Sequence, residues 1–300
     1  MPISNCTYRI SVIIACLNAA GTIRDQLEAL SHQSWAEPWE IIIADNGSKD
    51  SSMEIAKEYM NRLPALRIVD ASDKKGQAHA RNIGVRFSRA ESVVFCDADD
   101  EVAPGWVAAI GNALIKHDFV ASRTAITKLN PEWVLKSRSN PQEAGVQSYT
   151  YPPYLHHAGG GTIGVKRELF ESVGGFDESL PYLEDTDFSW KLQLMGIQLH
   201  FVPEAVIQLR FRDSLNGIFR QARNYAEYNV KLYKKYIPKG MPKIPLKDDL
   251  ASWKNFFVAI IKNLPRARKK SDAAIWAWRF GWRWGQLIGM IKYRILAINV

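Results

Sequence analysis

Residues 40–63 read EIIIADNGSKDSSMEIAKEYMNRL, and this stretch contains the pattern that decides the fold. Glu40–Asp45 is a run of consecutive apolar, β-branched residues, which is typical of a strand covered on both faces. A polar turn follows, and Ser51 with Glu54 has the spacing of a capping box that opens a helix to about Leu63. A strand, a turn and a helix in succession are the repeating unit of a parallel α/β sheet.

The same unit recurs on both sides of this stretch. The spacing predicts strands at Arg9–Cys16, Leu66–Asp70 and Ser92–Cys96 and helices at Thr22–Gln33 and Gln77–Ser88. We therefore predict the α/β class, with a doubly wound and mostly parallel sheet flanked by helices.

The pattern changes beyond Pro104, where strands and helices alternate less regularly. Residues 130–158 are typical of loops, and the glycines at 159–161 precede a short strand. The predicted elements are a helix to His117, an alternating stretch Phe119–Leu129, helices at Arg167–Val173, Glu184–Met195 and Ser214–Tyr236, and strands at Leu199–Val202 and Ala205–Leu209.

The composition is that of a globular chain of 300 residues and 34.0 kDa. The apolar, Gly and Pro content excludes a disordered or collagen-like chain, and no uncharged apolar run approaches the length of a membrane span. The cysteines, Cys6, Cys16 and Cys96, form neither a disulfide framework nor a metal quartet. We expect reduced core cysteines in a cytoplasmic protein.

The positive charge is concentrated in the C-terminal segment. Residues 243–300 contain twelve basic and three acidic residues and five of the ten tryptophans, whereas the rest of the chain is near neutral. This charge difference and a linker with three prolines divide the sequence into a domain at 1–240 and a basic tail at 241–300. The domain itself is split near residue 103 into two parts.

Residues 276–284 of this tail fit two periodicities. The aromatic residues alternate as in a strand, but a longer stripe from Trp276 through Phe280 and Trp284 to Ile291 favours a helix. Two interpretations fit this helical extension equally: residues 253–300 make peripheral contact with an anionic membrane, or they form an ordinary packing helix with a solvated basic edge. The first would place the chain on the inner face of the cell membrane.

Polar residues follow the carboxyl ends of four predicted strands. They are Asn18, Asp45 with Asn46, Asp70 with Asp73, and Asp97 with Asp99. Ligands bind beyond these ends in open α/β sheets, so we expect a site there for a cation, a sugar or a base edge. Asp97 and Asp99 lie two residues apart after a buried strand and can turn toward one hard cation, Mn²⁺ or Mg²⁺.

Six ordered motifs resemble glycosyltransferase family 2, the inverting nucleotide-sugar enzymes with a GT-A fold. The likeness runs from about Arg9 to Tyr236. The motifs are SVIIACLN at 11–18, IADNGSKD at 43–50, GQAHARN at 76–82, DAD at 97–99, VGGFDE at 173–178 and YLEDTDF at 182–188.

The resemblance implies roles for individual residues. Asp45 would accept a hydrogen bond from the base edge, which suits uracil, and Asp99 would bind the metal directly. Asp97 would contact the ribose or the metal's water shell, and Asp185 would be the general base, with Glu184 as its neighbour on the acceptor side. The whole implied nucleotide-sugar site comprises Ala15, Cys16, Leu17, Asn18, Asp45, Asn46, Gly76, Arg81, Asp97 and Ala98, and the implied acceptor side Gly160, Gly161, Thr162 and Glu184.

The sequence departs from the family pattern in two places. Leu17 stands where many relatives carry an aromatic residue that stacks on the base. The late strand region, residues 206–212, lacks the histidine that often serves as a third metal ligand, while Arg210 and Arg212 there could hold phosphates or remain solvated.

The resemblance implies a metal-dependent glycosyltransferase that moves a sugar from a UDP-sugar to a glycan or lipid-linked glycan in polysaccharide biosynthesis. Nucleic acid is not an expected partner, because the crevice is acidic. Two other functions stay open: a nucleotidyltransferase that acts on a sugar phosphate, and a catalytically silent, membrane-bound partner subunit.

Overall fold

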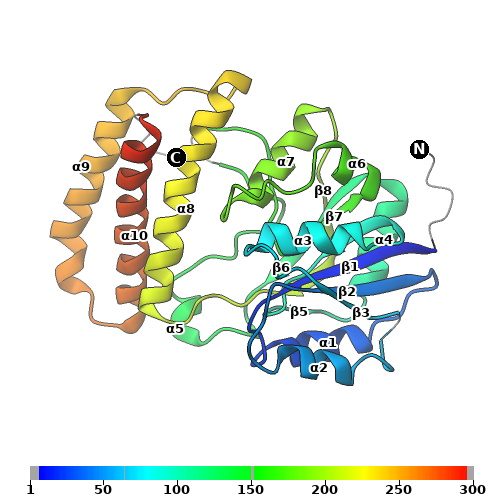
Figure 1. The fold of residues 1–300 in the computed structure, drawn as a ribbon. Coiled ribbons are helices and arrows are strands. Elements are labelled where there is room, and N and C mark those ends of the chain that lie inside the picture. The colour runs from blue at the N-terminus through cyan, green and yellow to red at the C-terminus, as the bar shows by residue number, and fades with distance from the viewer. Residues whose placement is uncertain (1–6, 64, 150–151, 296–300) are drawn as a thin grey trace. The chain divides into compact units, whose positions relative to one another are not determined.

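The computed structural model describes residues 7–63, 65–149 and 152–295, and in these ranges an eight-stranded sheet runs through the N-terminal unit (Figure 1). The strands lie in the order β3-β2-β1-β4-β7-β6-β8-β5. Their bounds are β1 (Tyr8–Cys16), β2 (Trp39–Asp45), β3 (Arg67–Asp70), β4 (Ala90–Phe95), β5 (Glu101–Val102), β6 (Phe119–Ala125), β7 (Ile163–Lys166) and β8 (His200–Gln208).

The first half of the sheet is parallel, as the strand–helix alternation predicts. β1 pairs with β2 and β4, and β2 pairs with β3, all in parallel. In this register Cys16 lies opposite Asp45, and Asp45 lies opposite Asp70. The polar residues that end these strands therefore meet along one edge of the sheet.

The second half of the sheet is mixed. β7 runs antiparallel to both β4 and β6, while β8 runs parallel to β6. The two strands predicted at 199–202 and 205–209 are one strand, and that division is wrong. The pairing instead shifts register between Val202 and Val206, because Pro203 has no N–H to donate to the ladder and forms part of an irregularity.

Helices cover both faces of the sheet. Val12 and Ile14 pack with α1 (Ile23–Ser31), α2 (Ser52–Glu58) and α4 (Trp106–Lys116), and Ile13 and Ile42 pack with α3 (Gln77–Arg86), α6 (Arg167–Ser172) and α7 (Glu184–Leu194). This two-sided core matches the doubly wound prediction. The predicted capping box at Ser51 is wrong: its side chain makes no capping bond, because its backbone (φ −77°, ψ 19°) is not extended.

The described chain divides into two compact units. The first comprises the described residues within 1–129, 140–147 and 156–210, and the second comprises those within 130–139, 148–155 and 211–300. The second unit is helical, with α5 (Glu132–Leu135), α8 (Leu215–Tyr236), α9 (Leu246–Asn263) and α10 (Lys270–Tyr293). α8 thus lies with the tail helices, and residue 240 as the end of the catalytic domain stays a prediction.

The helical prediction for residues 276–284 is confirmed, since they lie within α10. α8 and α10 lie side by side (Figure 1). Gly281, Gly285 and Gly289 allow their close approach, because a Cβ on any of these glycines would meet the backbone of α8 at Phe219, Arg223 or Glu227. Among the described residues, no helix has both the length and the apolar character of a membrane span.

Candidate active site

The loop after β1 and the loop after β2 are joined by hydrogen bonds at the sheet edge. The backbone N–H of Asn18 donates to Ser48 Oγ at 3.1 Å, and Lys49 N–H donates to Asn18 Oδ1 at 2.8 Å. Asp45 is half-buried, and its Oδ1 accepts from Ser48 N–H at 2.9 Å. Leu17 projects from this edge and is 49% exposed. The predicted residues 15–18 and 45 therefore lie together.

Asn46 and Gly76 are neighbours in the structure, although thirty residues separate them. The buried Asn46 amide donates to the carbonyls of Ala71 and Lys74, and its Oδ1 accepts from Gly76 N–H at 2.8 Å. These bonds fix the segment that leads into α3. Direct contact of Asn46 with a nucleotide stays a prediction.

Three carboxylates gather after β4. Asp97, Asp99 and Asp100 can each offer an oxygen within 4.8 Å of the others. Burial, followed by repulsion from Asp97 and Asp99, raises the pKa of Asp100 well above its usual range. The sequence motifs assign no role to Asp100, although it is part of the same acidic run.

Arg210 braces this acidic turn. Its backbone N–H donates to Asp100 Oδ1 at 2.8 Å, and its Nε donates to the Asp99 carbonyl at 2.8 Å. The sequence suggests two roles for Arg210, a phosphate contact or a solvated charge. Neither role predicts these bonds to Asp99 and Asp100.

The three carboxylates fit a hard divalent cation. They supply oxygen donors alone, as Mg²⁺ and Mn²⁺ prefer. Their mutual repulsion, evident in the raised pKa of Asp100, would be relieved by a bound cation. His200 is not part of the cluster, because it stacks on His117 with ring centroids 3.9 Å apart.

Arg81 lies at the centre of the site. Its guanidinium is almost fully buried and donates to Asp97 Oδ1 at 2.7 Å and to Glu184 Oε1 at 2.9 Å. This one side chain therefore joins the end of β4 to the start of α7. The prediction that Arg81 contacts the nucleotide is untested by this arrangement.

Gly160 and Gly161 leave the space that this ion-pair cluster occupies. A Cβ on Gly160 would clash with the Arg81 guanidinium, and one on Gly161 would lie 2.7 Å from the Asp97 carboxylate carbon. The buried Thr162 hydroxyl donates to the Gly159 carbonyl at 2.7 Å and so holds the turn. The glycine run is thus packed against charged side chains.

Asp185 is oriented by two backbone donors. Thr186 N–H donates to its Oδ1 and Gly160 N–H donates to its Oδ2, both at 2.7 Å. Burial is the main cause that raises the pKa of Asp185, against the opposing effect of Arg81. Burial and then the Asp185 charge raise the pKa of Glu184 to about 7. Asp187, by contrast, is fully buried, and its Oδ2 lies 3.0 Å from Lys191 Nζ.

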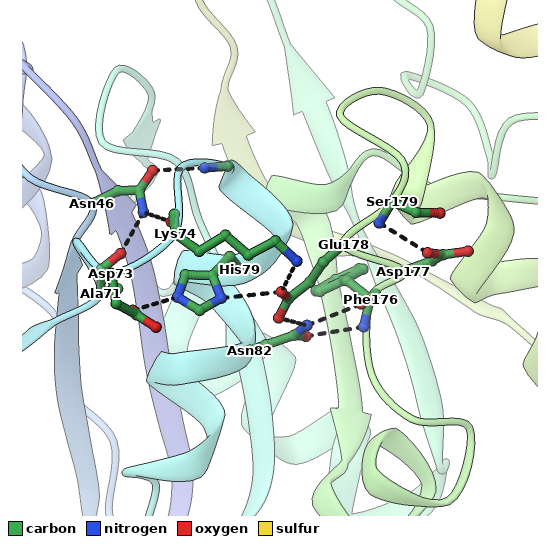
Figure 2. A network of polar contacts seen from close by, with 11 residues as sticks. Asn46, Ala71, Asp73, Lys74, His79, Asn82, Phe176, Asp177, Glu178 and Ser179 are labelled. Atoms are coloured by element: carbon green, nitrogen blue, oxygen red, sulfur yellow. Dashed lines mark hydrogen bonds and ion pairs between the residues drawn. The ribbon is translucent and has the colours of Figure 1, made fainter.

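A second network fixes the VGGFDE segment to α3 (Figure 2). Asn82 binds both the N–H and the carbonyl of Phe176, and Glu178 contacts His79 at 3.1 Å and Lys74 at 2.7 Å. Burial would raise the pKa of Glu178, but hydrogen bonds from Lys74, Asn82 and His79 outweigh it and lower that pKa to about 2. Two adjacent residues of α3 therefore hold two parts of the candidate site: Arg81 holds the ion-pair cluster, and Asn82 holds the 176–178 turn.

Comparison with known sequences identifies the family. The sequence model of glycosyl transferase family 2 matches residues 11–174, which is more than half of the chain. The chain belongs to glycosyl transferase family 2. The members of this family are glycosyl transferases, so the nucleotidyltransferase alternative is set aside.

Two relatives bracket the likeness of this glycosyltransferase to curated proteins. It is 34% identical over 132 residues to the uncharacterized glycosyltransferase YibD of Escherichia coli K12. This alignment covers 44% of this chain and 36% of that protein. It is 26% identical over 226 residues to poly-beta-1,6-N-acetyl-D-glucosamine synthase of Staphylococcus epidermidis, which covers 73% of this chain and 54% of that protein. The chain thus spans about half or less of the length of these relatives.

Solved structures confirm the GT-A fold of the glycosyltransferase. The mannosyltransferase PcManGT from Pyrobaculum calidifontis, in complex with GDP-Man and Mn²⁺, matches with a TM-score of 0.62 and 20% identity over 96% of this chain and 88% of that one. S. aureus TarS, in complex with UDP, matches with a TM-score of 0.52 and 18% identity over 95% of this chain and 85% of that one. At these identities the likeness establishes the fold.

The glycosyltransferase structure brings several of the predicted residues into direct contact. Arg81 and Asp97 form an ion pair, Arg81 and Glu184 form another, and Gly160 donates to Asp185. Ala98 is buried beside the carboxylates, and Ala15 and Cys16 end β1, where Cys16 lies opposite Asp45. Sequence reasoning missed Asp100 and the bracing role of Arg210, which only the tertiary contacts reveal.

Proposed function

We propose that this glycosyltransferase moves a sugar from a nucleotide-diphosphate sugar, in the first place a UDP-sugar, to a hydroxyl of a glycan or glycolipid, with inversion. The observation that carries this proposal is the Arg81 cluster. Arg81 forms one ion pair with Asp97, which lies beside Asp99 and Asp100, and another with Glu184, the neighbour of Asp185. Donor and acceptor groups would thereby be held in a fixed relation, which is what a direct transfer requires.

The nucleotide would bind at the edge formed by residues 15–18 and Asp45. Asp45 uses Oδ1 to accept from Ser48, and its second oxygen can accept from the N–H of a uracil edge. Structural neighbours hold UDP in one case and GDP-Man in another, so a nucleotide-diphosphate donor agrees with the fold. Polysaccharide biosynthesis is the corresponding role, as the name of one relative suggests.

Asp185 would act as the general base. Its carboxylate takes the proton of the acceptor hydroxyl, and that oxygen attacks the anomeric carbon opposite the departing diphosphate. The bond from that carbon to the diphosphate oxygen breaks, its electron pair leaves with the diphosphate, and the configuration inverts. Asp185 is favoured over Glu184, because Asp185 is partly exposed whereas Glu184 is buried and paired with Arg81.

Asp97 and Asp99, with Asp100 behind them, would hold a divalent cation, Mn²⁺ or Mg²⁺. When bound, such an ion offsets the charge that develops on the diphosphate. Arg210 would keep the turn in place through its bonds to Asp99 and Asp100.

The acceptor would be a glycan or a lipid-linked glycan, and residues 253–300 would make peripheral contact with an anionic membrane. The reaction would then take place on the cytoplasmic, inner face of the cell membrane. Gly160, Gly161 and Thr162 would line the acceptor side next to Asp185, because Gly160 already donates to that carboxylate.

Donor hydrolysis tests the proposal. UDP release is measured over a panel of UDP-sugars with Mn²⁺, Mg²⁺ or EDTA, for the wild type, Asp99→Asn, Asp185→Asn and the exposed control Asp118→Asn. We expect one donor to be hydrolysed, with the activity lost in EDTA and in Asp99→Asn and retained in the control. Retained anomeric configuration in the product, measured by proton NMR, would rule out the role proposed for Asp185.

A further inference from the structure

The outer side of α9 carries an exposed apolar stripe. Leu250, Phe257 and Ile261 are 61%, 54% and 75% exposed, and their spacing of seven and four residues puts them on one side of the helix. Folded monomers rarely expose contiguous large apolar patches, so such a stripe marks a surface with a partner.

α10 extends this surface. Phe280, Trp284 and Ile291 are exposed at spacings of four and seven residues, again on one side of the helix. Their side of α10 differs from the side of Gly281, Gly285 and Gly289, which packs on α8. The close packing of α8 and α10 therefore leaves this apolar side of α10 exposed.

Ring contacts make the two stripes continuous. Phe257 contacts Trp253 at 6.0 Å between ring centroids, Trp253 contacts Phe256 at 6.1 Å, and Phe256 of α9 contacts Phe280 of α10 at 5.7 Å. The name aromatic face is used below for Trp253, Phe256, Phe257, Phe280 and Trp284 together with the exposed Leu250, Ile261 and Ile291. It comes from two helices that lie side by side in Figure 1.

Positive charge borders the aromatic face. The turn between α9 and α10 exposes Arg266, Arg268 and Lys269. Lys270 is exposed at the start of α10, and Lys262 is exposed at the end of α9. Arg283 lies over the Trp253 ring, 5.1 Å from its centroid, and donates to the Ser252 carbonyl at 3.2 Å. Tryptophan with Lys and Arg beside an apolar stripe is the composition of helices that lie at headgroup depth.

The charge selects one occupant for this face. A second copy would bring two segments, each with twelve basic and three acidic residues over 243–300, against each other. An anionic bilayer would instead attract them. We propose that the aromatic face of α9 and α10 docks on the interface of an anionic phospholipid bilayer, with Phe257, Ile261 and Trp284 entering the acyl boundary.

This inference deepens the proposed peripheral contact and rests on it. The proposal for residues 253–300 leaves open which side of the helices meets the lipid. The docking face is now defined, and the glycine side of α10 is assigned to packing within the protein.

Vesicle flotation tests the docking face. The 300-residue chain is mixed with phosphatidylcholine vesicles that contain or lack phosphatidylglycerol, at low and at high salt. The variants are Phe257→Ser/Ile261→Ser and a matched control, Phe87→Ser/Ile115→Ser, which removes two exposed apolar side chains from the first unit. UDP-dependent thermal stabilisation and donor hydrolysis without vesicles are measured on the same preparations.

We expect the wild type and the control to float with the anionic vesicles, and high salt to weaken binding. The α9 variant should bind about tenfold or more weakly, because two large apolar side chains no longer leave water. Three outcomes would each overturn the inference: no flotation of the wild type, equal flotation of the α9 variant, or salt-independent binding to neutral vesicles. A concentration-dependent dimer that the α9 variant abolishes would assign the face to a second copy.

The readouts separate the two proposals. Intact donor hydrolysis without flotation contradicts the docking face alone, and flotation without hydrolysis of any donor contradicts the proposed reaction alone.

Discussion

The Arg81 guanidinium places a positive charge inside the protein, between the carboxylates of Asp97 and Glu184. Removing one member of such a cluster leaves the other charges buried without compensation, and this costs more than the loss of an exposed ion pair. Arg81 therefore affects both the stability of the first unit and the geometry of the site.

Arg81→Gln should lower the free energy of unfolding by about 3–5 kcal/mol, because Glu184 loses its buried counter-ion. Urea denaturation measures this change. Arg86→Gln, at an exposed position on the same helix, should change it by less than about 0.5 kcal/mol. Adding Glu184→Gln to Arg81→Gln should restore part of the loss, and a double variant that is less stable than Arg81→Gln alone would contradict the buried-pair explanation.

Gly161→Ala tests the contact between the glycine run and Asp97. The new Cβ would lie 2.7 Å from the Asp97 carboxylate carbon, so Asp97 must move away from Arg81 and from its place beside Asp99 and Asp100. We expect the kcat/KM for donor hydrolysis to fall about 100-fold, in line with the effect of a misplaced catalytic group. Gly145→Ala, where nothing lies within 4 Å of the added Cβ, is the matched control and should keep full activity.

Glu184 makes stability depend on pH in a defined direction. Its pKa is about 7 in the folded state, whereas the unperturbed pKa of a glutamate side chain is 4.5, so between these values the folded protein binds more protons than the unfolded chain. Stability should therefore fall as pH rises from about 4.5 to about 7, and then level off. Urea midpoints across this range should show a smaller fall for Glu184→Gln. The exposed Glu168→Gln serves as the control, and an unchanged slope in Glu184→Gln would contradict the assignment.

The sequence motifs predict which acidic residues belong to the site, but not how they are held. Asp97, Asp99 and Asp185 can be proposed from their motifs. The Arg81 contacts join residues 16 and 103 positions apart, and Asp100 meets Arg210 over 110 positions. No local periodicity encodes such pairings, so they become visible only when β4, α3 and α7 are placed in space.

Regular elements are easier to predict where one apolar pattern continues through the element. The strands β1, β2 and β4 each lie within about two residues of the predicted ranges, because their buried faces require consecutive apolar residues. The sequence does not reveal α5 within residues 130–158, since four residues are too few to show helical periodicity. The irregularity at Pro203 resembles the end of a strand in the sequence, which is why β8 is predicted as two strands.

Gly285→Ala tests how α10 packs on α8. Alanine is the better helix former by about 1 kcal/mol, so an isolated helix would gain stability. Here the added Cβ would collide with the Arg223 carbonyl, and the helices must separate. We expect net destabilisation of about 1–3 kcal/mol, as in overpacked cores. It can be measured by thermal unfolding monitored at the helical circular dichroism band. Ile291→Ala, on the exposed side of α10, is the control, and a stabilised Gly285→Ala would contradict the close packing.

At the scale of the whole molecule, the candidate catalytic residues and the basic segment belong to different units. The acidic site residues Asp45, Asp97, Asp99 and Asp185 all belong to the first unit, and the basic turn and the aromatic face belong to the second. The first unit has its core on both sides of the sheet, whereas the second consists of helices with one packed side and one exposed side. A chemical probe of unfolding that reacts with residues of one unit therefore need not detect unfolding of the other.

The buried thiols provide a probe for global unfolding of the first unit. Burial raises the pKa of Cys16 to about 11 and that of Cys96 well above its usual range, so both should resist alkylation in the folded protein. Peptide-resolved mass spectrometry after iodoacetamide treatment should show both sites modified together as urea unfolds the sheet. Modification of Cys96 well before Cys16 would mean that β4 opens separately from β1.

The position of Arg81 along the chain restricts how this enzyme could be recombined with its relatives. The strands β2 and β4, which lead to Asp45 and Asp97, precede residue 104, and the glycine turn and the start of α7 follow it. A crossover near residue 104 would replace everything that follows this residue. Arg81 would then come from one parent, and its partner Glu184 would come from the other. Grafted segments that lack an acid at position 184 or glycines at 160 and 161 should then be rejected, because they would leave Arg81 unpaired or displaced. These three positions, together with the 176–178 turn that Asn82 holds, restrict which chimaeric descendants can fold, whatever sugar each parent uses.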